Sequence, residues 1–172
     1  MPRTRADLLA SYRSYLALQR DLSAHTVRAY LVDISDLLSF LGVGEGDAEP
    51  VDTALATLDL ADLRDWLAAM AASGHSRATL ARRSASVRTF SSWAFETGLL
   101  TSDVAARLRA PRVDNRLPGV LTPQQASQLL KTASDLASDG HVLAVRDLAI
   151  IETLYATGVR VSELVGLDVA DL

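Results

Sequence analysis

Residues 23–42 have the sequence SAHTVRAYLVDISDLLSFLG, in which apolar side chains recur every three or four positions. That spacing places them on a single face of an α-helix. The members of this apolar face are Val27, Tyr30, Leu31, Ile34, Leu37, Leu38 and Leu41. Ser23 is a typical N-cap and Gly42 a typical helix stop, so the stretch predicts one long amphipathic helix. Its apolar face requires other helices to cover it.

The same periodicity predicts further helices on both sides of this segment and indicates no strand. Helices are expected over residues 5–19, from about Asp59 to Ser73, and over residues 76–96. A glycine-containing loop is predicted over 42–56 and a short helix over 102–108. In the segment 76–96, the residues expected to face inward are Leu80, Ser84, Val87, Ser91 and Ala94. The fold class is therefore predicted to be all-α, with a bundle of four to five helices at the front of the chain.

A change of composition separates this bundle from a second helical unit. Residues 110–119 read APRVDNRLPG, a polar run bounded by prolines. Beyond it, Thr122 is a typical N-cap, Pro123 suits the first helical position and Gln125 completes a capping box. Further helices are expected over 142–156 and 161–165. These features predict a helical unit over residues 1–110, an interdomain linker over 111–119 and a second unit over 120–172.

The composition excludes several classes of protein. The chain of 172 residues is 49% hydrophobic, which is enough for a sizeable core, and it has no cysteine for a disulfide, a thiolate metal site or a thiol nucleophile. His25, His75 and His141 lack the spacing of metal ligands, so neither a metal site nor a cofactor is predicted. No signal peptide or membrane-length apolar run is visible, so a cytoplasmic protein without a membrane partner is expected.

Positive charge is concentrated in the middle of the chain. Residues 75–116 carry eight arginines against three acidic residues, a net charge of +5, whereas residues 1–74 and 117–172 carry −5 and −4. A basic region between acidic ends can attract phosphate directionally even when the whole chain has a net charge of −4. The alternative interpretation is a solvated arginine-rich helix with no ligand.

The segment LYATGVRVSEL at residues 154–164 is the strongest candidate for chemistry. Gly158 is expected to end one helix, and Arg160 to begin the next. An arginine at such a corner, beside free backbone N–H groups, is suited to bind an anion. Arg160 could instead form only a surface ion pair with Glu163.

This segment resembles the A-T-G-x-R-x-S-E-L box of tyrosine recombinases, especially the bacterial Xer branch. Residues 145–149 (VRDLA) and 116–118 (RLP) are similar to the same branch, and residues 143–147 (LAVRD) lean toward its C type. The similarity covers nearly the whole chain. It implies a SAM-like core-binding domain, a linker and the first helices of a mainly helical catalytic domain.

The resemblance also implies roles for residues in the box. Arg160 would be a catalytic arginine that holds the scissile phosphate, and Glu163 would be a buried carboxylate that orients it. A tyrosine would attack the phosphodiester and form a 3′-phosphotyrosyl link without a metal or ATP. The family's other catalytic residues, its nucleophile included, follow this segment, so the chain is expected to be the front portion of a recombinase and inactive alone.

In the family the second and fourth helices of the core-binding domain face DNA. The residues that these helices would expose here are Thr26, Arg28, Arg77, Thr79, Arg82, Arg83, Ser86 and Arg88. Arginines and hydroxyl groups at helical spacing can reach phosphates and base edges. Arg83 lies at the margin of the apolar face, so it could instead pair within the protein. Trp66 and Trp93 are expected to be packing residues.

The sequence is therefore compatible with three functions. The first is site-specific recombination, as in the resolution of chromosome dimers. The expected partners are a double-stranded recombination site and identical or paralogous subunits in a tetrameric synapse. The second is a short, noncatalytic DNA-binding regulator of a full-length recombinase. The third is a helical interaction domain with no DNA role, which the basic segment 76–96 disfavours.

Overall fold

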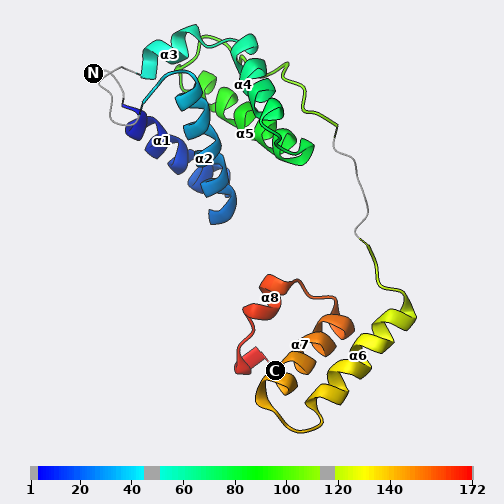
Figure 1. The fold of residues 1–172 in the computed structure, drawn as a ribbon. Coiled ribbons are helices and arrows are strands. Elements are labelled where there is room, and N and C mark those ends of the chain that lie inside the picture. The colour runs from blue at the N-terminus through cyan, green and yellow to red at the C-terminus, as the bar shows by residue number, and fades with distance from the viewer. Residues whose placement is uncertain (1–3, 45–50, 113–118, 172) are drawn as a thin grey trace. The chain divides into compact units, whose positions relative to one another are not determined.

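A computed structural model describes residues 4–44, 51–112 and 119–171. Every regular element within these ranges is helical, which confirms the predicted all-α fold class (Figure 1). The chain divides into two compact units, residues 1–115 and 116–172. This division falls inside the segment 111–119 predicted as a linker, of which residues 113–118 lie outside the described residues.

The first unit has five described α-helices, four of which follow a residue that caps them. They are α1 (Arg5–Ser14), α2 (Ala24–Phe40), α3 (Val51–Thr57), α4 (Leu60–Ala72) and α5 (Arg77–Glu96). The side chains of Thr4, Ser23, Asp59 and Ser76 each accept a hydrogen bond from a backbone N–H in the first turn of the helix that follows. The N-cap predicted at Ser23 is therefore confirmed.

The helix predicted over residues 5–19 is present, whereas two other local predictions in this unit are wrong. The end of the first predicted helix is a π-helix, η1 (Tyr15–Gln19), which continues α1 with a wider backbone turn. The segment 42–56 is not all loop, because α3 begins at Val51 and buries Val51 and Leu55. Residues 102–108 form turns rather than a helix, in which the burial of Ala105 and Leu108 fixes the chain.

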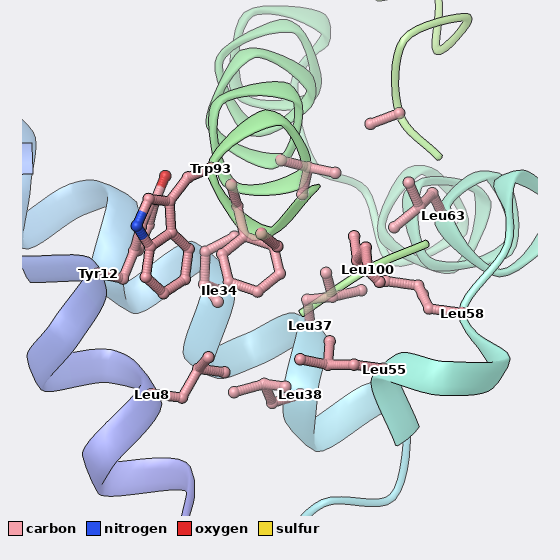
Figure 2. Packing of buried hydrophobic residues seen from close by; sticks show 14 of the residues in the cluster. Leu8, Tyr12, Ile34, Leu37, Leu38, Leu55, Leu58, Leu63, Trp93 and Leu100 are labelled. Atoms are coloured by element: carbon pink, nitrogen blue, oxygen red, sulfur yellow. The ribbon is translucent and has the colours of Figure 1, made fainter. Parts of the chain in front are cut away.

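The apolar faces of these helices meet in one continuous hydrophobic core (Figure 2). The α2 helix contributes Ile34, Leu37 and Leu38, and it packs directly against both α1 and α5. The residues predicted to face inward from α5 are all buried, namely Leu80, Ser84, Val87, Ser91 and Ala94. Trp66 and Trp93 are buried too, so their predicted packing role is confirmed.

The second unit is a small helical assembly with little interior. It contains α6 (Pro123–Ala137), α7 (Val142–Thr157), α8 (Val161–Val165) and a 3-10 turn η2 (Val169–Asp171), and α6 packs along α7. Thr122, Pro123 and Gln125 form the predicted capping box with proline at its start. Gly158 adopts φ +65° and ends α7 as predicted. Among the described residues of this unit, only Ala133 is a buried hydrophobic residue.

No helix in the described ranges is long and apolar enough to cross a membrane.

Candidate nucleic-acid interface

The N-terminal turns of α2 and α5 are built in the same way. In α2, the Ser23 hydroxyl accepts the N–H of Thr26 at 3.3 Å and lies 3.0 Å from the Thr26 hydroxyl. In α5, the Ser76 hydroxyl accepts the N–H of Thr79 at 3.1 Å and also lies 3.0 Å from the Thr79 hydroxyl. Both threonines are therefore fixed at a helix N-terminus, where the backbone dipole favours anions.

Four of the five predicted contact arginines are exposed on these two helices, Arg82 among them. Arg28 on α2 is exposed and has no ion pair with any described residue. Arg77, in the first turn of α5, is exposed. Arg88 is also exposed, and its Nη1 donates to the carbonyl oxygen of Leu108 at 3.4 Å. These side chains can carry their charge to a ligand in solvent.

Arg82 is both partly exposed and bound to the protein. Its Nη1 and Nη2 donate to the two carboxylate oxygens of Asp33 on α2, the second at 2.9 Å. The Asp33 side chain is fully buried, whereas 43% of the Arg82 side chain is exposed. The hydrogen bond that Arg82 donates to Asp33 raises the pKa of Arg82 further above its ordinary value, so this guanidinium stays charged.

Arg83 faces the protein, which was the alternative considered for it. Its Nη1 pairs with Asp36 and contacts the sulfur of Met70, and its Nε lies 3.4 Å from the Asp33 carboxylate. The guanidinium carbon sits 5.7 Å from the ring centroid of Trp66, within the range of a cation–π contact. With only 13% of its side chain exposed, Arg83 belongs to the packing between α2, α4 and α5.

The prediction that Ser86 is exposed is wrong. Ser86 is fully buried, because α5 is covered along a wider face than its apolar stripe indicated. Phe90, one turn further along α5, is also buried and packs edge-to-face against Tyr12 of α1, with ring centroids 5.2 Å apart. Ser86 therefore offers no hydroxyl group to a ligand in this conformation.

Two acidic residues that bind the arginines of α5, Asp33 and Asp36, were not predicted from the sequence. Asp33 lies three residues after Tyr30 and four before Leu37, so the helical period places it on the apolar face of α2. A carboxylate at such a position needs a buried cation, and the arginine-rich segment 76–96 could supply one. This pattern was a usable signal for the ion pairs between α2 and α5.

In the second unit, Arg160 is the N-cap residue of α8, directly after the turn at Gly158. Its backbone N–H donates to Glu163 Oε2 at 2.9 Å and its Nη1 to Glu163 Oε1 at 3.0 Å. The side chains of Arg160 and Glu163 are 81% and 51% exposed. The two residues thus form a surface ion pair, which was the alternative considered for Arg160, and Glu163 is not a buried carboxylate here.

Comparison with known proteins identifies the family. The family model described as the phage integrase N-terminal SAM-like domain matches residues 9–98, which include α2 and α5. The chain belongs to the phage integrase family of tyrosine recombinases. The model described as the phage integrase family itself matches residues 119–172, which include Arg160. The recognition drawn from the box at residues 154–164 is thereby confirmed.

The chain is similar to curated tyrosine recombinases named XerC. It is 47% identical over 165 residues to those of Mycobacterium sp. (strain JLS) and Mycobacterium tuberculosis (strain ATCC 25177 / H37Ra). These matches cover 96% of this chain and 53% of each relative, so the chain spans about half the length of the curated relatives it matches. No solved structure matches it.

Proposed function

We propose that this chain serves site-specific DNA recombination, with α2 and α5 binding a duplex recombination site and Arg160 binding the phosphate that is cleaved. The observation that carries this proposal is the set of exposed arginines and half-buried threonines on α2 and α5, two helices that pack against each other within the region that matches the SAM-like family model. Resolution of chromosome dimers, with identical or paralogous subunits in a tetrameric synapse, is the expected setting.

The first step is binding of the DNA backbone and groove edges. Arg28, Arg77 and Arg88 supply exposed guanidinium groups for phosphates or guanine edges. Thr26 and Thr79 supply hydroxyl groups at the helix N-termini, because their backbone N–H groups already donate to Ser23 and Ser76. Phosphate contacts fix the orientation of a protein on the duplex, and any base contact adds selectivity.

The second step is stabilisation of charge at the scissile phosphate. As a tyrosine oxygen attacks phosphorus, negative charge builds on the nonbridging oxygens, and a guanidinium matches two of them at once. Arg160 has most of its side chain in solvent, and Glu163 engages it from one side. The carboxylate thus restricts the guanidinium while leaving donors for the phosphate.

The nucleophile is expected to come from outside these 172 residues. Tyr12 and Tyr15 are buried in the core of the first unit, and Tyr30 is half-buried there. Tyr155 is exposed but precedes Arg160 by only five positions, on the helix α7 that leads into the Gly158 turn. We therefore expect no covalent adduct between DNA and residues 1–172 alone.

A nicked suicide substrate tests the role of Arg160. Residues 1–172 would be joined to the C-terminal half of the Mycobacterium tuberculosis relative, and covalent adducts would be resolved on denaturing gels. Arg160→Ala should abolish the adduct while DNA binding stays largely intact. Arg146→Ala removes another exposed, ion-paired arginine from α7, and as the control it should preserve the adduct.

Two results would contradict this assignment. A covalent adduct formed by residues 1–172 alone would show that the nucleophile is misplaced. Loss of DNA binding together with cleavage in Arg160→Ala would indicate that the Arg160–Glu163 pair supports the fold rather than the reaction. DNA binding by residues 1–172 with no activity in the joined protein would favour the noncatalytic regulator.

A further inference from the structure

The ion pair between α2 and α5 places one charged group inside the core and its partner at the surface. Asp33 is fully buried on the apolar face of α2, between Tyr30 and Leu37 in the helical period. A buried carboxylate is costly unless its oxygens are bound by cationic donors. Both oxygens of Asp33 are bound by Arg82, and Arg83 Nε lies 3.4 Å from one of them.

The geometry of this pair leaves one edge of Arg82 available. Asp33 engages one N–H of each terminal nitrogen of the guanidinium, so the Nε–H and the remaining terminal N–H groups are not used by it. With 43% of the Arg82 side chain exposed, these donors can meet solvent or a ligand. Arg82 also lies one helical turn beyond Thr79, whose position at the start of α5 is fixed by Ser76.

We infer that Asp33 is a positioning residue for DNA recognition, which holds Arg82 with its free edge directed at the duplex. This inference rests on the proposed function and assigns a role within the same surface. An arginine side chain loses rotamer freedom when it binds, and an arginine already fixed by a carboxylate has lost that freedom on folding. Asp33 thus lowers the ordering cost of the DNA contact.

The inference makes a prediction opposite in sign to simple charge counting. Asp33→Asn removes one negative charge from the protein, which by long-range electrostatics alone should strengthen binding to phosphate. If Asp33 positions Arg82, the same substitution frees the guanidinium and should weaken binding. The expected loss is about 2- to 10-fold in Kd, the range set by the ordering of one long side chain.

A double-mutant cycle on the 172-residue chain tests this, with a short fluorescent duplex of mixed sequence as the probe. Asp33→Asn should weaken binding in the natural background and have no weakening effect in an Arg82→Ala background. Asp36→Asn is the matched control, because Asp36 lies on the same helix as Asp33 but does not bind Arg82. Its carboxylate binds Arg83 and accepts the indole N–H of Trp66. This substitution should cause no loss of affinity even if it lowers the melting temperature.

A second measurement needs no substitution at a buried position. Side-chain ¹⁵N relaxation of the arginine Nε–H groups should show Arg82 ordered like the backbone before DNA is added, with Arg28 mobile. Equal mobility of Arg82 and Arg28 would overturn the inference. Tighter DNA binding by Asp33→Asn, or an equal loss of affinity in the natural and Arg82→Ala backgrounds, would also overturn the inference. In either case, a loss of affinity in Arg28→Ala would still support the proposed function. Absence of any binding by the natural chain would overturn both.

Discussion

At the scale of single residues, the buried hydroxyl of Tyr12 lowers the stability of the fold, and a conservative substitution should remove this effect. Its ring packs against Phe90 and Trp93, with centroids 5.2 Å and 5.0 Å apart, but its hydroxyl is buried without a hydrogen-bond partner among the described protein groups. Tyr12→Phe keeps the ring and deletes this hydroxyl. The free energy of unfolding should rise by about 1 kcal/mol, measured by urea denaturation at neutral pH.

The same substitution should change the response to alkaline pH. Burial, followed by the nearby Tyr30 and Tyr15, raises the pKa of Tyr12 well above its ordinary value of about 10. Below about pH 10 both folded and unfolded chains keep this proton; above it, only the unfolded chain releases it. The free energy of unfolding should therefore fall by up to about 1.4 kcal/mol per pH unit, and Tyr12→Phe should reduce that slope. An identical slope in both proteins would contradict the assignment.

Individual side chains also show which features of the site could be predicted from the sequence and which could not. Arg28, Arg77 and Arg88 are exposed as predicted, because their positions follow from the helical period alone. Ser86 was misplaced because its burial depends on neighbours from other helices, which the period of α5 does not contain. The partners of Arg82 and Arg83 lie 49 and 47 residues away along the chain, so pairing them requires knowledge that α2 packs on α5.

At the scale of elements, the long helices were predictable because capping residues and apolar period agree within each of them. The limits of α2 and α5 follow from Ser23, Ser76 and the glycines that stop them. Short elements were not predictable in this way. The helix α3, about two turns long, follows a glycine- and proline-containing run, and it is held by burial of Val51 and Leu55 rather than by its propensity.

The end of α5 provides a direct test of an element boundary. Gly98 adopts φ +74°, and the following N–H groups of Leu99 and Leu100 both donate to the Ala94 carbonyl, at 2.7 Å and 3.0 Å. No neighbouring atom would meet a Cβ at this position, so the cost of a side chain is conformational. Gly98→Ala should lower the free energy of unfolding by about 1 kcal/mol in a denaturant titration.

Gly119→Ala is the matched control for that experiment. A Cβ there also meets no atom within 4 Å, and Gly119 does not have a positive φ. It should leave the free energy of unfolding of the first unit unchanged. Equal effects of the two substitutions would show that the left-handed conformation at Gly98 does not limit the end of α5.

At the scale of the whole molecule, buried apolar surface is distributed very unequally between the two units. The α5 helix buries residues along its whole length, whereas α7 has no buried residue among those described. Amide hydrogens in α7 should therefore exchange much faster than those in α5 when both are corrected for intrinsic rates. Hydrogen exchange with mass spectrometry would measure this. Equal protection of α5 and α7 would mean that the second unit is stabilised by contacts outside those described.

The distribution of charge is also a property of the whole molecule, and the structure shows which positive charges of the basic segment are paired within the protein. Two of the eight arginines in residues 75–116, Arg82 and Arg83, are matched by the carboxylates of Asp33 and Asp36 on α2. The attraction to phosphate that the sequence assigned to the whole segment is therefore weakened at Arg82 and Arg83, whose charges are offset within the protein. The helical period could locate these side chains, but it could not show which charges the fold neutralises.

The most direct test of the DNA-binding surface is a titration of a short labelled duplex at several salt concentrations. Arg28→Ala should weaken binding and reduce the slope of log K against log salt by about 1, because one phosphate contact is lost. Arg64→Ala removes another exposed charge, on α4 and outside the proposed surface, and should leave the slope unchanged. Equal losses for Arg28→Ala and Arg64→Ala, or no loss for Arg28→Ala and Arg77→Ala combined, would contradict DNA binding through α2 and α5.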